Sequence, residues 1–382
     1  MRKSVFLVLA LASYAASAIA AEPIKIGMTE PLTGDIAASG TYVADGAKVA
    51  VSVINREGGV LGRKIQLILE DNKSNPKEAV ATAEKLLSGD KVPVLLGAWG
   101  STLTLAIMPR LLDYKVPMIV ETASSGKITT SGNPYIFRIS PPSSLEAKAF
   151  ADKILNSFDP PIKKASMLVV NNDWGRGAAD EFTKVLKSKG IEIGTVETMT
   201  GDATDISAQL AKIKQAGGDT VFVTTGIEQL TLVLKQAQEQ RLPQRFVSTG
   251  GATAPDQLID QAGSAADGSY HIVFFTPWFP EEAPHTDLAK AFIAEWKKQG
   301  YNPAGLTDGY RGYDGILTAV AAIKKAGKAE PAAIRDALWQ IEVKGINGDI
   351  KFNKVGPSGS ESGQSTPNIF IVQIKGGKVI KP

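Results

Sequence analysis

Small and hydroxyl-bearing residues gather where an apolar, strand-like segment gives way to a helical one. Residues 97–102 follow the apolar segment 92–96 and open the helix that we expect over 101–112. Free backbone amides at a helix N-terminus, together with the hydroxyls of Ser101 and Thr102, suit a carboxylate. Ser101 can also cap its own helix, and the two roles are compatible. We expect ligand contacts from four residues of this junction: Trp99, Gly100, Ser101 and Thr102.

A second polar loop, residues 121–126, follows the next strand-like segment, 117–120. In a doubly wound sheet the carboxyl ends of neighbouring strands meet at one edge, and ligands bind there. Two adjacent hydroxyl-rich strand ends favour a shared anion site, whereas the alternative is an ordinary polar loop. The residues that we expect to take part are Ala123, Ser124 and Ser125.

Three further junctions lie in the second series of strand-like and helical segments. Trp174 stands among polar residues where a strand-like segment meets a helix. It can stack on a ligand across a cleft or pack against its own helix. Gly226 and Gly250 follow two later strand-like segments and offer backbone and space, while Glu228 is either a first-turn helix acid or a ligand partner. We expect ligand contacts from Trp174, Gly226 and Gly250.

Side chains for catalysis are scarce. The chain has two histidines, His271 and His285, no cysteine, no G-x-S-x-G motif and no P-loop. His271 lies in an apolar run, which is typical of a buried structural histidine. We therefore expect no catalytic residue, no metal site and no cofactor.

The elements that must position these junctions alternate regularly along the chain. The first series has strand-like segments at 24–28, 65–69, 92–96 and 117–120. Its helical segments lie at 42–55 and 101–112, and a further one begins at residue 76. The second series has strands at 166–170, 191–196, 220–224 and 245–248, with helices at 175–187, 205–215 and 228–240. Such alternation predicts an α/β fold with two doubly wound, parallel-sheet lobes.

The two series meet near Pro141 and Pro142, and the pattern changes again after Pro277. Long helices at 288–299 and 308–326, then strands near 348–352 and 369–374, are expected to return and complete both lobes. We predict a first lobe of residues 24–140 plus about 277–338, and a second of 141–276 plus about 343–382. Several crossings between lobes form a multi-strand hinge, which suits closure around a ligand.

The N-terminus has the pattern of a secretory signal peptide, residues 1–20. Arg2 and Lys3 precede an apolar run at 5–11, and Ala18 and Ala20 suit cleavage near Ala20. The apolar run is too short for a membrane span. Losing its two cations brings the formal charge of +3 close to neutrality, which gives no electrostatic case for nucleic acid. We expect a periplasmic protein, and a monomer. Because the chain has no cysteine, it must be stabilised by its hydrophobic core and not by disulfides.

Several motifs in order along the chain carry a family resemblance: PLTG at 31–34, NREGGVLGRK at 55–64, EDN at 70–72, GAWGS at 97–101, NDWGRG at 172–177 and YRGYD at 310–314. The chain resembles the branched-chain amino-acid-binding family of periplasmic solute receptors, which share the type I bilobed fold. The resemblance covers essentially the whole mature chain. It implies a small-molecule ligand and a membrane permease of an ABC importer as partners.

The family pattern also implies roles for particular residues. It binds the ligand carboxylate with a serine at the position of Ser101 and with the loop at 123–125, and it covers the ligand with an aromatic at the position of Trp174. Its amino-acid specialists hold the ammonium with an acid whose place falls near Gly250 or Gly251, where this sequence has none. A buried ammonium without a partner is costly.

We therefore expect a carboxylate-bearing ligand with a flat or apolar body, foremost an aromatic acid. Two alternatives remain open. One is an amino-acid or amide ligand, with Asp173 or Glu228 supplying the negative charge. The other is a periplasmic ligand sensor.

Overall fold

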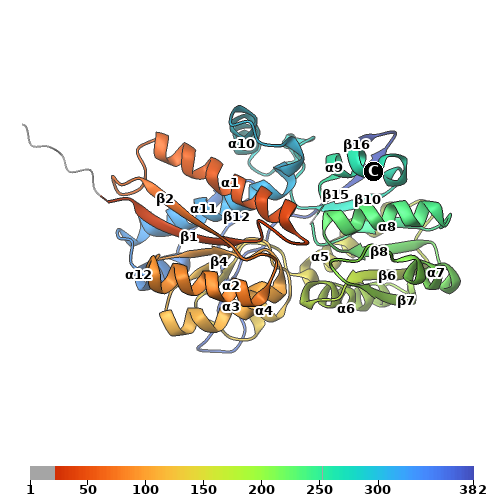
Figure 1. The fold of residues 1–382 in the computed structure, drawn as a ribbon, viewed down its shortest axis with the longest axis horizontal. Helices are drawn as coiled ribbons and strands as arrows, with labels where there is room; N and C mark the ends of the chain where they lie inside the picture. The colour runs from red at the N-terminus through yellow and green to blue at the C-terminus, as the bar shows by residue number, and fades with distance from the viewer. Residues whose placement is uncertain (1–21, 252) are drawn as a thin grey trace, which may run out of the picture.

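The computed structural model describes residues 22–251 and 253–382, so the predicted signal peptide and its cleavage site lie outside the described residues. Two seven-stranded sheets form the centres of two lobes that lie side by side (Figure 1). Within the described ranges, no helix is both long and apolar enough to cross a membrane.

The sheet of the first lobe has the order β13-β14-β5-β4-β3-β1-β2. Its neighbouring strands are parallel, apart from the antiparallel pair β13–β14. The strands are β1 (Ile24–Glu30), β2 (Ile65–Asp71), β3 (Leu95–Gly97), β4 (Met118–Val120), β5 (Ile136–Arg138), β13 (Asn353–Val355) and β14 (Ser362–Gln364). The helices of this lobe are α1 (Ala37–Arg56), α2 (Pro76–Glu84), α3 (Ser101–Tyr114), α4 (Lys127–Thr130), α10 (Thr286–Lys298), α11 (Leu306–Ala326) and α12 (Pro331–Leu338).

The sheet of the second lobe has the order β16-β15-β10-β9-β8-β6-β7. The antiparallel strands β15 and β16 extend it beyond the parallel strands. Its strands are β6 (Lys164–Val170), β7 (Glu192–Met199), β8 (Thr220–Thr224), β9 (Arg245–Ser248), β10 (Tyr270–Val273), β15 (Phe370–Lys375) and β16 (Lys378–Ile380). Its helices are α5 (Ser143–Ala149), α6 (Asp173–Ser188), α7 (Ser207–Ala216), α8 (Ile227–Glu239) and α9 (Pro255–Ala262). A two-stranded hairpin of β11 (Val343–Gly345) and β12 (Gly348–Ile350) belongs to neither of the two large sheets.

The predicted fold class, two parallel-dominated α/β lobes, is confirmed by this topology. One part of the expected lobe division differs from the structure. We expected residues 343–382 in the second lobe, but β13 and β14 fall within this range and β14 pairs with β5 of the first sheet. The pairing depends on Gly363, because a Cβ there would stand 2.6 Å from the ring of Phe137. The side chain of Gln364 adds a hydrogen bond from Arg138 at 2.6 Å. The other lobe boundaries stay a prediction.

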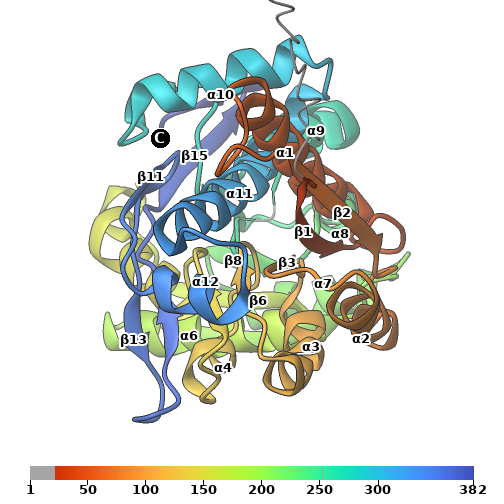
Figure 2. The ribbon, with the colours of Figure 1, turned by 90° about the vertical axis from the view of Figure 1, so that its left-hand side faces the viewer.

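Helices α1 and α11 pack along one another over the first sheet (Figure 2). Glycines allow the close approach: a Cβ on Gly46 would stand 1.7 Å from the carbonyl oxygen of Gly309, and one on Gly312 would stand 1.9 Å from that of Val43. This contact fixes the rotation of α11 about its axis. The side chains of α11 next to these glycines are therefore held at the boundary between the lobes.

Candidate ligand-binding site

Helix α3 begins at Ser101, with Gly100 at its cap. Gly100 has a φ of 98°, a left-handed value that would strain a residue with a Cβ. The sequence had left open whether the Ser101 hydroxyl caps its own helix. Because Gly100 holds the cap position, this hydroxyl does not cap the helix. Instead its oxygen accepts the backbone N–H of Ser125 at 3.0 Å. This bond joins the two junctions that we expected to be neighbours.

The loop after β4 is held from behind by Arg138, which the sequence did not single out. Its guanidinium is fully buried and donates to the carbonyl oxygens of Ala123 at 3.2 Å and Ser125 at 2.7 Å. Burial lowers the pKa of Arg138 to about 9. Because this side chain binds two carbonyls of the loop, it fixes the position of the loop beside Ser101.

Trp99 and Trp174 come from different lobes and touch one another. Their ring centroids are 5.3 Å apart and the rings are nearly perpendicular, at 87°. Both side chains are buried, and the indole N–H of Trp99 has no hydrogen-bond partner among the described residues. Trp174 also lies against Gly250, where a Cβ would stand 2.5 Å from its ring. Trp174 thus packs across the lobe boundary and not only on its own helix.

These residues line a narrow cavity of about 10 Å³ between the lobes, which has room for about one water molecule. Seven of the predicted site residues line it: Trp99, Gly100, Ser101, Ala123, Ser124, Trp174 and Gly250. Thr102 and Gly226 line an adjoining, wider hollow of about 250 Å³ that shares both tryptophans with the inner cavity. Ser125 lines neither and supports Ser101 through its amide.

Thr102 reaches the other lobe. Its hydroxyl donates to a carboxylate oxygen of Asp173 at 3.0 Å, and the amide of Asp173 donates back to the hydroxyl oxygen at 3.2 Å. Lys127 adds an ion pair to Asp173 at 3.6 Å, although its side chain is 73% exposed. Asp173 therefore joins the lobes and does not line the cavity.

A buried cation, Arg311 of α11, lines the inner cavity as well, and the sequence did not mark it as a site residue. Its guanidinium donates to the carbonyl of Gly251 at 2.7 Å and lies 3.2 Å from a carboxylate oxygen of Asp308. It also stacks over the ring of Phe274, 5.0 Å from the centroid. The motif around Arg311 was visible in the sequence, but only the packing of α11 brings this side chain to the cavity.

An acid stands close to Gly250 although the sequence has none there. The carboxylate of Glu146, on α5, accepts the N–H of Gly250 at 2.6 Å. Its other oxygen has no hydrogen-bond partner among the described residues. Burial raises the pKa of Glu146 to about 7. The contact joins residues far apart in sequence, so local patterns could not reveal it.

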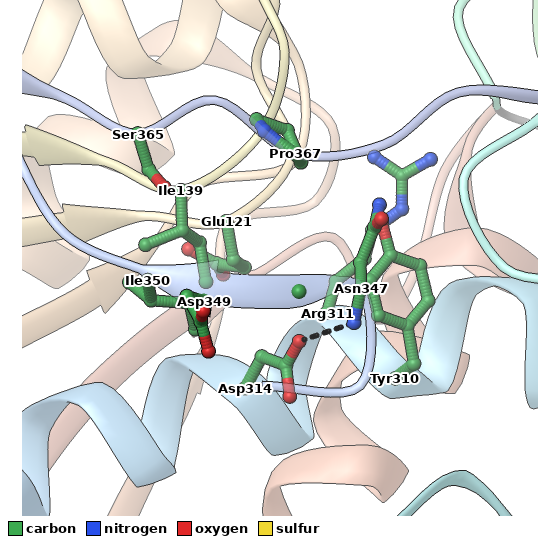
Figure 3. A pocket seen from close by; sticks show the side chains of 11 residues that line it. Glu121, Ile139, Tyr310, Arg311, Asp314, Asn347, Asp349, Ile350, Ser365 and Pro367 are labelled. Carbon is green, nitrogen blue, oxygen red and sulfur yellow. Dashed lines mark hydrogen bonds between the residues drawn. The ribbon is translucent and has the colours of Figure 1, made fainter. Parts of the chain in front are cut away.

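A second cavity lies where the chain crosses between the lobes, and Arg311 lines this one too (Figure 3). Asp314 accepts the amides of Ile346 at 2.9 Å and Asn347 at 3.4 Å, the latter drawn as a dashed line in Figure 3. Burial raises the pKa of Asp314 to about 7. Glu121 also lines this cavity and accepts the N–H of Gly97 at 2.9 Å. Arg311 therefore stands between the inner cavity and the segments that cross between the lobes.

Comparison with known proteins decides the family. The sequence model of the family described as Periplasmic binding protein matches residues 23–378. The chain belongs to this family. The resemblance predicted from the motifs is thereby confirmed, and the chain is a periplasmic solute-binding receptor.

Several relatives of this periplasmic binding protein cover nearly its whole length. The leucine-, isoleucine-, valine-, threonine- and alanine-binding protein of Pseudomonas aeruginosa is 28% identical over 351 residues, covering 92% of this chain and 91% of the relative. Two similar solved structures carry ligands. A branched-chain amino acid transporter substrate-binding protein of Streptococcus pneumoniae, in complex with isoleucine, has 26% identity and a TM-score of 0.79, covering 94% of this chain and all of the other. An ABC transporter solute-binding protein of Rhodopseudomonas palustris, in complex with 3,4-dihydroxybenzoic acid, has the same identity and TM-score, covering 94% and 95%.

Proposed function

We propose that this protein is the solute receptor of an ABC importer and binds a small carboxylate-bearing ligand, foremost an aromatic acid, between its lobes. One observation carries the proposal: a single interlobe cavity is lined by the Ser101 hydroxyl and by two tryptophans, one from each lobe. A polar end and an aromatic wall in one cavity match a ligand with a carboxylate and a flat body. The loaded receptor then delivers the ligand to the membrane permease.

The carboxylate end of the ligand lies at the start of α3. The amides of the first turn of α3 have no helical partner, and the hydroxyl of Ser101 lies beside them. The hydroxyl of Ser124 lines the same cavity from the neighbouring loop. Two strand ends thus supply donors to one anion, and no metal is needed for this.

The body of the ligand lies against the tryptophans. Because Trp99 and Trp174 meet edge to face, they form a corner and leave no slot for a ring between them. A flat ligand can lie on the face of one ring and the edge of the other. The indole N–H of Trp99, which has no partner among the described residues, is available to a hydroxyl or carboxylate of the ligand.

An amino-acid ligand is a second candidate because of Glu146. Its free carboxylate oxygen is the kind of partner that a buried ammonium needs. Neither acid that the sequence offered takes this place: Asp173 is bonded to Thr102, and Glu228 is absent from the lining of the cavity. Glu146 does not line the cavity either, whereas Arg311 does, so the aromatic acid is favoured.

A thermal-unfolding screen of the purified protein tests the proposal. The panel contains benzoate, 3,4-dihydroxybenzoate, 3-phenylpropanoate, isoleucine, leucine and short fatty acids. A ligand present at 100 times its dissociation constant stabilises the fold by about 2.7 kcal/mol, which raises the midpoint by several degrees. We expect aromatic acids to give the largest shifts. Shifts from amino acids alone would make the second candidate the correct one, and no shift from any carboxylate would refute the proposed ligand class.

A further inference from the structure

Arg311 is a buried cation with few partners. Its side chain is 2% exposed, and a guanidinium has five N–H donors. The described residues supply one hydrogen-bond acceptor, the carbonyl of Gly251, and the ion pair with Asp308. The Nε of Arg311 is the atom that faces Asp308, at 3.2 Å, and this contact lacks the alignment of a hydrogen bond. Leaving a buried charge short of partners is costly, so a further acceptor is expected from whatever fills the cavity.

The position of the guanidinium is built into the surrounding residues. The ring of Phe274 lies under its plane at 5.0 Å. Gly251 has a φ of 60°, and a Cβ there would stand 2.8 Å from a terminal nitrogen of Arg311, so glycine leaves room for the side chain. The packing of α11 on α1 through Gly309 and Gly312 fixes its backbone. A guanidinium held on three sides, with the cavity on the fourth, is arranged to meet a ligand.

Three acids surround Arg311, and burial disfavours the ionised form of each. Asp308, Glu121 and Glu146 are its charged neighbours, and all three are buried. Burial raises the pKa of Asp308 to about 6 and that of Glu146 to about 7, and it also raises the pKa of Glu121. At pH 7 Asp308 is therefore mostly ionised and pairs with Arg311, Glu146 is about half protonated, and the guanidinium stays charged.

We propose that Arg311 determines the charge class of the ligand: it binds a negatively charged or hydrogen-bond-accepting group and excludes an ammonium group from the cavity. The ligand class is then small organic acids without an α-ammonium group. This inference rests on the proposed function, since it assumes that the cavity lined by Ser101 is the ligand site. It adds the residue that separates organic acids from amino acids.

Two matched pairs of probes test it: 3-phenylpropanoate with phenylalanine, and 4-methylpentanoate with leucine. The members of each pair differ by one α-ammonium group. Isothermal titration measures the dissociation constants for the wild type, R311Q and R311K. The quantity compared is the dissociation constant of the amino acid divided by that of the acid without the ammonium group. We expect the wild type to prefer the acid without the ammonium. The ratio should fall about tenfold or more in R311Q, since like charges across a buried site repel strongly, and persist in R311K.

The double variant D308N/R311Q guards against a folding defect, because it removes both charges of the ion pair and leaves neither of them buried without its partner. R335Q, a change on the surface of the first lobe, is the matched control and should leave the ratio unaltered. A purely structural role for Arg311 would weaken both members of a pair equally. An unchanged ratio in folded R311Q or D308N/R311Q, or a wild type that prefers the amino acids, would overturn the inference and leave the receptor function standing. If no probe binds the wild type, the proposed function fails as well.

Discussion

The indole rings of Trp99 and Trp174 meet edge to face across the boundary between the two lobes, with centroids 5.3 Å apart. Trp99 precedes α3 of the first lobe, and Trp174 lies in the first turn of α6 of the second lobe. A contact between lobes of this kind requires that they lie close together. The structure therefore represents a closed arrangement, and opening at the hinge would separate the two rings.

Replacing Trp174 with alanine should weaken ligand binding strongly. The side chain closes the cavity from the second lobe, and a buried tryptophan at the centre of a binding site contributes about 2 kcal/mol or more. We expect a loss of about thirtyfold in affinity, measured by isothermal titration, and a smaller loss in W174F. Trp278, which bonds to Asp256 and lines none of the cavities described above, provides the control W278A. Equal losses in W174A and W278A would refute the site.

Replacing Ser101 with alanine should reduce both affinity and stability. The hydroxyl contacts the ligand in the proposed site and accepts the buried amide of Ser125. An amide that loses its buried acceptor costs about 1–3 kcal/mol, so the free energy of unfolding without ligand should fall by that amount. The control is S188A, an exposed hydroxyl at the end of α6. Unchanged affinity in S101A would contradict the assignment of the carboxylate site.

The bond between Thr102 and Asp173 should set how readily the lobes close. In D173A the closed form loses this bond, so ligand affinity should fall about two- to tenfold. The ligand-free protein should also show a larger radius of gyration in X-ray scattering. D173N keeps an acceptor for the hydroxyl and should behave nearly as the wild type. K127A should have little effect, because exposed ion pairs contribute about 0–1 kcal/mol. If K127A equals D173A, the ion pair and not the hydrogen bond controls closure.

Much of the site could be predicted from the sequence because it depends on topology. The carboxyl ends of parallel strands share one edge, so the junction at Ser101 and the loop at 123–125 had to be neighbours if the strands were ordered as a doubly wound sheet. Trp174 was recognisable because a tryptophan at a polar strand end is unusual. These inferences needed only local patterns and one rule of fold geometry.

The residues that the sequence did not reveal reach the site through tertiary packing. Arg311 lies in the second turn of α11, and its direction is set by the contact of α11 with α1. Glu146 meets Gly250 across a gap of 104 positions. The strands β13 and β14 are too short for a periodic pattern, and their place beside β5 depends on a glycine that lets Phe137 approach. No local pattern contains this information.

Stability should depend on pH through Glu146. Its pKa is about 7 in the folded protein and 4.5 ordinarily. Between these values the folded state keeps a proton that the unfolded chain has released, so the free energy of unfolding should fall as the pH rises through this window. The contribution of this carboxyl is at most about 3 kcal/mol. Asp314, also raised to about 7, and Asp308, raised to about 6, add in the same direction.

The variant E146Q isolates the share of Glu146 in this dependence. A glutamine keeps an oxygen for the amide of Gly250 but cannot ionise, so the variant should be more stable than the wild type at pH 8 and nearly equal to it at pH 4.5. Urea unfolding at both pH values without ligand measures the difference. E239Q, at an exposed carboxyl at the end of α8, is the control. If the difference between E146Q and the wild type is the same at both pH values, Glu146 is not the group that titrates in this range.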